Sequence, residues 1–203
     1  MNREINEYIL RQIEVGGIQT NCYIFGSKLN KEVAIIDPGA DYEKIKAILD
    51  RDDLKPVCII NTHGHVDHIG ANSRFNLPIY IHKEDADFLT DPKLNLSAFY
   101  GGSVVSPEAS RTLSDGDRID ISDVSLRVIH TPGHTPGGIS LKYDDILFAG
   151  DTLFANGVGR TDFPYGDSDK LMISIREKLM VLEDKVVVLP GHGLASTIGK
   201  ERN

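Results

Sequence analysis

The chain has few cysteines and no apolar run long enough to span a bilayer, and each absence excludes a class of protein. Cys22 and Cys58 are its only two cysteines. Neither has the Cys-x-x-Cys spacing of a redox or zinc motif, so we expect both to be buried apolar residues in a reducing compartment. The opening Met1-Asn2-Arg3-Glu4-Ile5-Asn6-Glu7 has acidic residues and no apolar core, unlike a signal peptide. We therefore expect a cytoplasmic protein with no membrane partner.

Basic residues are also scarce, and they form no cluster. The chain carries 22 Lys and Arg against 30 Asp and Glu, a formal net charge of -8 and a pI near 5.3. This balance repels a phosphate backbone, so we expect no nucleic-acid partner. Its 40% hydrophobic and 26% charged content is that of an ordinary globular protein. A length of 203 residues predicts one domain, 1–203, with a substantial core.

Hydrophobic periodicity predicts short strands and few helices. The expected strands cover residues 8–14, 18–26, 33–36, 57–60, 124–130, 138–143, 145–149 and 185–189. The expected helices cover residues 41–49, 66–75, 83–89 and 168–182. The stretch 92–110, rich in Pro, Ser and Gly, is expected to be an irregular connection.

A dense group of metal-ligand side chains is the most informative feature that the chain does contain. The stretch Thr62-His63-Gly64-His65-Val66-Asp67-His68 has four of them within six residues, directly after an apolar strand. Histidines two apart on extended chain point the same way. Asp67 and His68, where a helix could begin, approach the same point from its other side. This segment can therefore ligate two ions.

Three further ligand side chains follow apolar strands in the second half of the chain. They are His134 in Thr131-Pro132-Gly133-His134, Asp151 in Gly150-Asp151-Thr152, and His192 in Pro190-Gly191-His192-Gly193. Loops at strand ends converge on one edge, where rigid sheets can hold their side chains in place. We expect seven ligands to meet there: His63, His65, Asp67, His68, His134, Asp151 and His192.

Imidazoles and carboxylates without a thiolate favour zinc and also admit iron or manganese. If His63, His65 and His134 hold one divalent ion, then three ligands remain for a second ion and Asp151 for a bridge. Two ions about 3.5–4 Å apart lower the pKa of shared water, polarise a carbonyl oxygen and stabilise a departing anion. The site is therefore that of a hydrolase.

Two residues near the cluster are candidates for orienting its imidazole N–H groups. Asp37 and Thr62 both stand at strand ends close to the ligands. Asp37 fits equally well as the turn-forming residue of Asp37-Pro38-Gly39. His82 and His130 lack a ligand-rich setting, and we expect them to be structural.

Together these motifs resemble the metallo-β-lactamase superfamily, from the Asp37-Pro38-Gly39 turn to Gly193. The resemblance implies an α/β (α+β) fold, a four-layer αββα sandwich of two mixed β-sheets flanked by helices. It implies that Asp67, His68 and His192 hold the second metal and that Asp151 bridges. Gly150-Asp151-Thr152-Leu153-Phe154 and Gly157-Val158-Gly159-Arg160-Thr161-Asp162 look like the glyoxalase II (hydroxyacylglutathione hydrolase) branch. The chain ends eleven residues after His192, as in short single-domain bacterial relatives that lack the helical glutathione-binding domain.

This likeness implies a small-molecule thioester substrate of the S-(2-hydroxyacyl)glutathione type, cleaved by a metal-bridging hydroxide. Asp67 would be the catalytic residue that orients the hydroxide and receives its proton. Arg160 would bind a carboxylate of the thiol carrier, unless it pairs with a nearby acid. Antibiotic hydrolysis is disfavoured, because β-lactamases of this fold carry no bridging carboxylate at the position of Asp151.

Three other functions stay open. The stretch Gly159-Arg160-Thr161-Asp162-Phe163 is also similar to persulfide dioxygenases, which oxidise with a single iron. The chain could instead be another ester or lactone hydrolase of the same fold, or a non-catalytic metal-binding module. Metal stoichiometry separates oxidation from hydrolysis, and the oligomeric state is not predicted.

Overall fold

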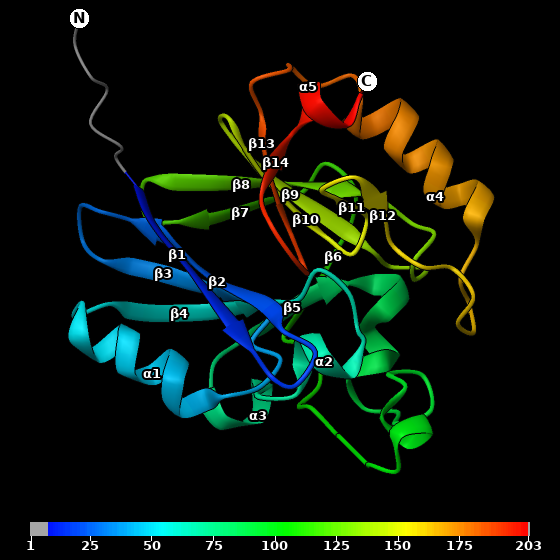
Figure 1. Ribbon diagram of the computed structural model, residues 1–203. Coiled ribbons are helices and arrows are strands. Elements are labelled where there is room, and N and C mark those ends of the chain that lie inside the picture. Colours follow the sequence, from blue (N-terminus) through cyan, green and yellow to red (C-terminus); the bar gives the residue numbers. More distant parts are fainter. Residues whose placement is uncertain (1–7, 203) are drawn as a thin grey trace, which may run out of the picture.

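Two six-stranded mixed sheets pack face to face in the computed structural model, which describes residues 8–202 (Figure 1). The opening seven residues, for which the sequence predicts no signal peptide, lie outside the described residues. No helix in the described range is both long and apolar enough to cross a membrane. Helices flank each sheet on its outer face.

The first sheet begins as an antiparallel meander and continues with parallel strands. Its strands, in spatial order, are β1 (Tyr8–Val15), β2 (Thr20–Ser27), β3 (Glu32–Ile36), β4 (Lys55–Ile60), β5 (Ile79–His82) and β6 (Arg111–Leu113).

The second sheet is antiparallel except where the neighbouring strands β10 and β13 run parallel. Its strands, in spatial order, are β14 (Ser196–Thr197), β13 (Val187–Pro190), β10 (Ile146–Gly150), β9 (Ile139–Tyr143), β8 (Val124–His130) and β7 (Arg118–Ile121). A separate hairpin consists of β11 (Leu153–Phe154) and β12 (Gly157–Val158).

The helices are short. They are α1 (Tyr42–Arg51), α2 (Val66–Ile69), α3 (Asn72–Phe75), α4 (Ser168–Ser174) and α5 (Ile198–Glu201), with 3₁₀ helices at Lys83–Leu89 and Ser97–Tyr100 and a π-helical turn at Ile175–Leu179 that continues α4.

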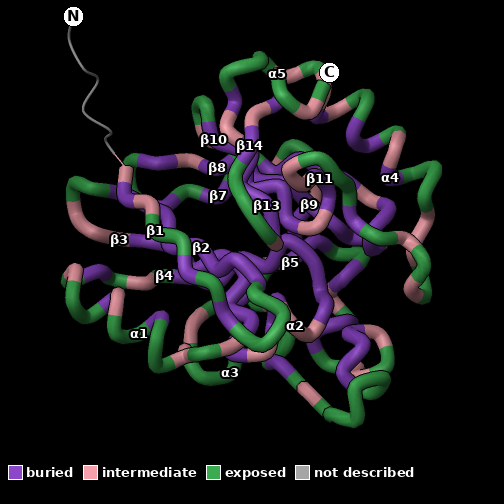
Figure 2. The backbone as a smooth tube through the Cα atoms, viewed as in Figure 1, coloured by how far each residue is buried: buried purple, intermediate pink, exposed green. Residues whose placement is uncertain are grey.

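Three apolar layers hold the sandwich together. The buried residues, purple in Figure 2, are concentrated along the strands of the two sheets. Between the sheets, the Phe148 ring lies 5.2 Å from the rings of Tyr23 and Phe25. On the outer face of the first sheet, Ile45 of α1 packs in the layer that contains its strands, and Leu171 of α4 does the same on the second sheet. These layers confirm the four-layer αββα prediction.

The structure departs from the predicted elements in two ways. Six strands, β5, β6, β7, β11, β12 and β14, were not predicted, because each has only two to four residues. The helix predicted over 66–75 is two helices, because the Ala71 N–H donates to the Pro38 carbonyl (2.9 Å) rather than continuing a helix. The interruption brings the start of α2 against the Asp37-Pro38-Gly39 turn, which becomes part of the site.

Candidate metal centre

The loops that follow β4, β8, β10 and β13 meet at one edge of the sandwich, and they carry the seven predicted ligands. The side chains fall into overlapping groups whose ligand-type atoms lie within 4.8 Å of one another. These groups are His63, His65 and His134; His63, His68 and Asp151; and Asp67, His68 and His192. The predicted convergence of the four loops is thus present in the structure.

The first group brings three ring nitrogens together in a buried position. His65 Nδ1 lies 3.1 Å from His63 Nε2 and 2.9 Å from His134 Nε2. Burial, together with the neighbouring imidazoles, lowers the pKa of His63 well below its usual range and that of His65 to about 3. The His63 and His65 rings are therefore neutral at pH 7. One proton on His65 Nδ1 cannot satisfy both contacts well, whereas a divalent cation accepts all three lone pairs.

The second group is held around a carboxylate oxygen. Asp67 Oδ2 lies 3.3 Å from His68 Nε2 and 3.1 Å from His192 Nε2. Asp151 faces both groups with different oxygens: Oδ1 is 3.4 Å from His68 Nε2, and Oδ2 is 3.6 Å from both His134 Nε2 and His192 Nε2. Asp151 therefore lies between the two groups and faces both of them.

Two buried atoms at the centre of the site make no hydrogen bond. They are His68 Nε2 and Asp151 Oδ1, whose mutual approach lacks hydrogen-bond geometry. His68 Nδ1 also lacks a hydrogen bond of good geometry, although Asp37 Oδ2 lies 3.0 Å away. Burial lowers the pKa of His68, but the carboxylates of Asp67, Asp151 and Asp37 outweigh it and hold that pKa well above its usual range. Unsatisfied buried polar atoms are costly, and a cation between them removes the cost. The donor set therefore fits divalent metal ions.

Asp37 contacts one of the ligand histidines, and Thr62 contacts Asp37. Asp37 Oδ2 is 3.0 Å from His68 Nδ1, and the two carboxylate oxygens accept from Thr62 N–H (2.7 Å) and Thr62 Oγ1 (2.6 Å). Asp37 also has a positive φ of 52°, so it forms the turn as well as contacting the imidazole. Carboxylate contacts of this kind fix the orientation of a ligand histidine.

Backbone carbonyls fix the tautomers of two other histidines. His134 Nδ1 lies 2.6 Å from the Arg160 carbonyl, and His192 Nδ1 lies 3.2 Å from the Ile18 carbonyl. A carbonyl only accepts, so each Nδ1 carries a proton, and Nε2 is the ring nitrogen that faces the ligand groups. The loops at 18 and 160 therefore orient ligands without supplying any.

Sequence reasoning missed the contribution of β2. Thr20 Oγ1 donates to Asp67 Oδ2 (3.0 Å), and Thr20 pairs with His192 as an isolated bridge. The Asn21 N–H donates to the Gly191 carbonyl at 2.7 Å. The strand thus supports the last ligand loop. No local sequence signal marks the role of β2, because its contacts join segments that are far apart in the sequence. Thr20 and Asp67 are 47 positions apart, and the contacts with the loop of His192 span more than 150 positions.

His82, Glu84 and His130 form another group of ligand-type atoms outside the centre. The two imidazole rings are stacked, with centroids 3.9 Å apart and planes 15° from parallel. A bound metal lies close to the plane of each imidazole, so two nearly parallel rings in face-to-face contact do not direct their lone pairs at one ion. The contact is one of packing, as expected from the sequence.

A groove of about 820 Å³ opens over the site, and five of the seven side chains line it: His65, Asp67, His134, Asp151 and His192. Its walls are largely apolar, with contributions from Ile18, Tyr100, Val104, Phe154, Val158 and Phe163. Arg160 is the one lysine or arginine among its lining residues. The Arg160 guanidinium donates from Nε and Nη2 to both oxygens of Asp162 (2.7 and 2.6 Å) and lies 3.9 Å from the Phe163 ring centroid.

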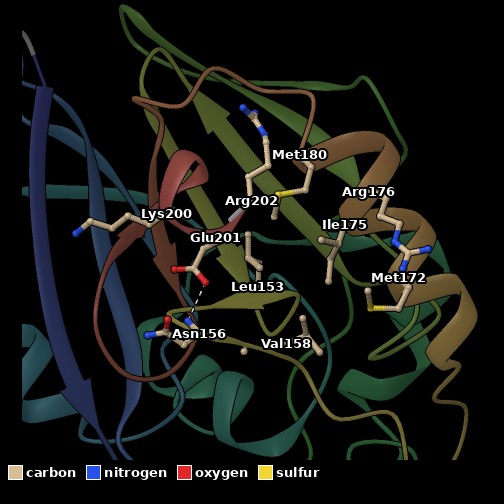
Figure 3. A pocket seen from close by; sticks show the side chains of 11 residues that line it. Leu153, Asn156, Val158, Met172, Ile175, Arg176, Met180, Lys200, Glu201 and Arg202 are labelled. Atoms are coloured by element: carbon tan, nitrogen blue, oxygen red, sulfur yellow. Dashed lines mark hydrogen bonds between the residues drawn. The ribbon is translucent and has the colours of Figure 1, made fainter.

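A smaller cavity of about 340 Å³ lies between the β11–β12 hairpin, α4 and α5 (Figure 3). Val158 borders both this cavity and the groove. Inside it, Glu201 accepts a hydrogen bond from the Asn156 N–H at 2.8 Å. None of the seven side chains lines it, so the groove is the cavity that belongs to the metal centre.

A four-layer sandwich with imidazole and carboxylate ligands at one edge defines a metal-dependent, hydrolase-like protein. A model of the Metallo-beta-lactamase superfamily matches residues 15–192, and the chain belongs to this superfamily. Among its relatives, hydroxyacylglutathione hydrolase GloC of Haemophilus influenzae is 35% identical, with 94% of this chain and 93% of the relative covered.

Solved structures agree with this membership. The BLEG-1 B3 metallo-beta-lactamase is 39% identical with a TM-score of 0.90, covering 95% of this chain and 96% of that one. TTHA1623 in a di-iron-bound form is 32% identical with a TM-score of 0.84 and the same coverage of both chains. The resemblance to the superfamily that the motifs suggested is thereby confirmed.

Proposed function

We propose that this protein is a binuclear metal-dependent hydrolase that cleaves thioesters of the S-(2-hydroxyacyl)glutathione type. The observation that carries the proposal is the pair of ligand groups joined by Asp151 at the floor of an apolar groove. The hydroxyacylglutathione hydrolase name of a relative that is 35% identical supports the substrate class.

In this proposal His63, His65 and His134 hold one ion, and Asp67, His68 and His192 hold the other. Asp151, which faces both groups, would be available as a ligand to either ion. The histidine excess favours zinc, with iron or manganese as alternatives, and the di-iron form of TTHA1623 supports a two-metal site. When bound, two divalent ions lower the pKa of water between them and polarise a carbonyl oxygen.

The chain's own residues supply an oriented carboxylate and a cation for the substrate. Burial raises the pKa of Asp67, but His68 and His192 outweigh it and hold that pKa below its usual range. Asp67 is therefore an ionised acceptor, oriented by Thr20 Oγ1, that can align an attacking water. In the proposal it also accepts the proton of that water. Arg160 Nη1, which Asp162 does not engage, is free to donate to a carboxylate of the thiol carrier.

Release of free thiol from S-lactoylglutathione tests the proposal on protein loaded separately with zinc, iron or manganese. Asp67→Asn is expected to lower kcat by roughly 10²- to 10⁴-fold, the usual contribution of a positioned base. Arg160→Gln is expected to raise KM with kcat nearly unchanged. Lys185→Gln, which removes an exposed ion pair with Asp145, is the matched control and is expected to behave as wild type. No thiol release with any of the three metals would defeat the substrate assignment.

The same preparations distinguish the competing functions. A chromogenic cephalosporin tests antibiotic hydrolysis, which the name of BLEG-1 suggests, and phenyl ester and lactone substrates test other acyl groups. Faster turnover of any of these than of the thioester would replace the proposal. Oxygen uptake on glutathione persulfide by protein holding one iron would assign oxidation instead, and two ions bound without turnover on any substrate would assign a binding module.

A further inference from the structure

Asp85 is a fully buried carboxylate that lies beside the metal centre and ligates nothing. It sits in the 3₁₀ helix Lys83–Leu89, which follows β5 of the first sheet. Three groups donate to it: Gly64 N–H to Oδ2 (3.0 Å), Thr135 Oγ1 to Oδ2 (2.7 Å) and Gly137 N–H to Oδ1 (2.6 Å). Every donor comes from a loop that carries one or more of the proposed metal ligands.

The three donors belong to two loops that descend from different sheets. Gly64 stands between His63 and His65, in the loop that follows β4 of the first sheet. Thr135 directly follows His134, in the loop that connects β8 and β9 of the second sheet. The contacts of Asp85 therefore join the two loops that carry the all-histidine group.

The arrangement leaves little freedom for this carboxylate. A Cβ at Gly137 would lie 2.5 Å from Asp85 N and 2.7 Å from Asp85 Oδ1, so only glycine lets that loop approach. Burial raises the pKa of Asp85 to about 6, although the three hydrogen bonds lower it. A buried carboxyl is expensive to maintain, and an apolar residue would serve if packing were its only role.

We propose that Asp85 is a positioning residue that clamps the two loops at the separation that His63, His65 and His134 need to hold one ion. It acts on this group alone. None of its hydrogen bonds reaches the segment of Asp67 and His68 or the loop of His192. The inference rests on the ligand assignment of the proposed function.

Competitive zinc titration with a chromophoric chelator tests the clamp. Asp85→Asn keeps one acceptor oxygen. With that oxygen at the Oδ2 position the NH₂ faces Gly137 N–H, and with it at the Oδ1 position the NH₂ faces Gly64 N–H, so one backbone donor loses its acceptor in either orientation. We expect one of the two zinc ions to bind roughly 10- to 100-fold more weakly, which is the usual effect of losing a hydrogen-bond partner that orients metal ligands. The affinity for the other zinc ion should be unchanged. Cobalt substitution adds a spectroscopic signature, because only the absorption of the three-histidine site should change.

Thr135→Val and Thr135→Ser provide a second pair, which serves if Asp85→Asn does not fold. The valine removes one donor with little change of shape and should weaken the same zinc ion, while the serine keeps the hydroxyl and should restore its affinity. Leu49→Ala, in α1 and away from the site, controls for lost stability and should leave both affinities unchanged.

Three outcomes would overturn the clamp. Wild-type affinity for both ions in Asp85→Asn or Thr135→Val would show that the two loops keep their separation without the contacts of Asp85. Equal weakening of both ions, or weakening in Leu49→Ala to the same degree, would show a general structural role. Failure of the wild-type protein to bind two zinc ions would instead remove the ligand assignment on which the inference rests.

Discussion

Gly191→Ala adds one methyl group beside the proposed metal centre. The new Cβ would lie 2.8 Å from His68 Cε1 and closer still to Asp151 Oδ1. The backbone of Gly191 has little room to retreat, because its N–H donates to the Gly150 carbonyl (2.8 Å) and its carbonyl accepts from Asn21 N–H (2.7 Å). The Asp151 carboxylate must therefore move.

The size of that movement sets the expected effect. A carbon–oxygen contact requires about 3.3 Å, so the carboxylate is displaced by roughly 1 Å. A displacement of this size at a reacting centre lowers activity by about 100-fold. Because Asp151 faces both groups of ligands, both metal affinities should fall, each by roughly 10- to 100-fold, or about 1.4 to 2.8 kcal/mol.

Zinc titration, thioester turnover and urea unfolding of the variant are the measurements. Gly193→Ala is the matched control, because it lies in the same loop with φ at +75° and nothing within 4 Å of its added Cβ. Its backbone strain should lower the free energy of unfolding by about 1 kcal/mol while leaving zinc affinity nearly intact. Wild-type zinc affinity and turnover in Gly191→Ala would refute the reasoning, since Asp151 would then not be held where the structure places it.

Three further changes test other parts of the structure. Asp37→Asn removes the carboxylate beside His68 Nδ1, so zinc titration should show one ion weakened by roughly 10- to 100-fold, and unchanged affinity would exclude the orienting role. Burial and the neighbouring His130 lower the pKa of His82 to about 4, below the ordinary 6.5. The folded state thus resists protonation of His82, and the free energy of unfolding should fall as the pH drops from about 6.5 toward 4. In metal-free protein, His82→Phe should make the free energy of unfolding, measured by urea titration, depend less on pH over this range. An unchanged pH dependence would contradict the assignment. Phe148→Ala empties space between the sheets and should lower the free energy of unfolding by about 3–5 kcal/mol, whereas a loss below about 1 kcal/mol would mean that the sheets are not packed as described.

The ligand loops were predictable because the information for each is local. An apolar run ends, a glycine or threonine turn follows, and a histidine or aspartate stands within a few residues, as at His134 and Asp151. The same locality explains the predicted strands, since β3, β4, β8 and β10 are continuous apolar or alternating runs. Short strands such as β6, with two of three residues exposed, carry no such pattern.

Contacts between distant segments were not predictable. The Asp85 clamp joins positions 21, 50 and 52 residues apart, and Thr20 reaches Asp67 across 47. No periodicity or motif encodes such pairs, because they depend on how the two sheets are stacked. The partner of Arg160 illustrates the opposite case: Asp162 lies only two residues away, and the sequence left pairing with a nearby acid open beside substrate binding.

Anomalous scattering at the zinc edge from crystals grown with zinc tests the central claim most directly. The account predicts two peaks per chain, one among His63, His65 and His134 and the other among Asp67, His68 and His192, with Asp151 in contact with both. A single peak, or zinc bound away from these side chains, would contradict it.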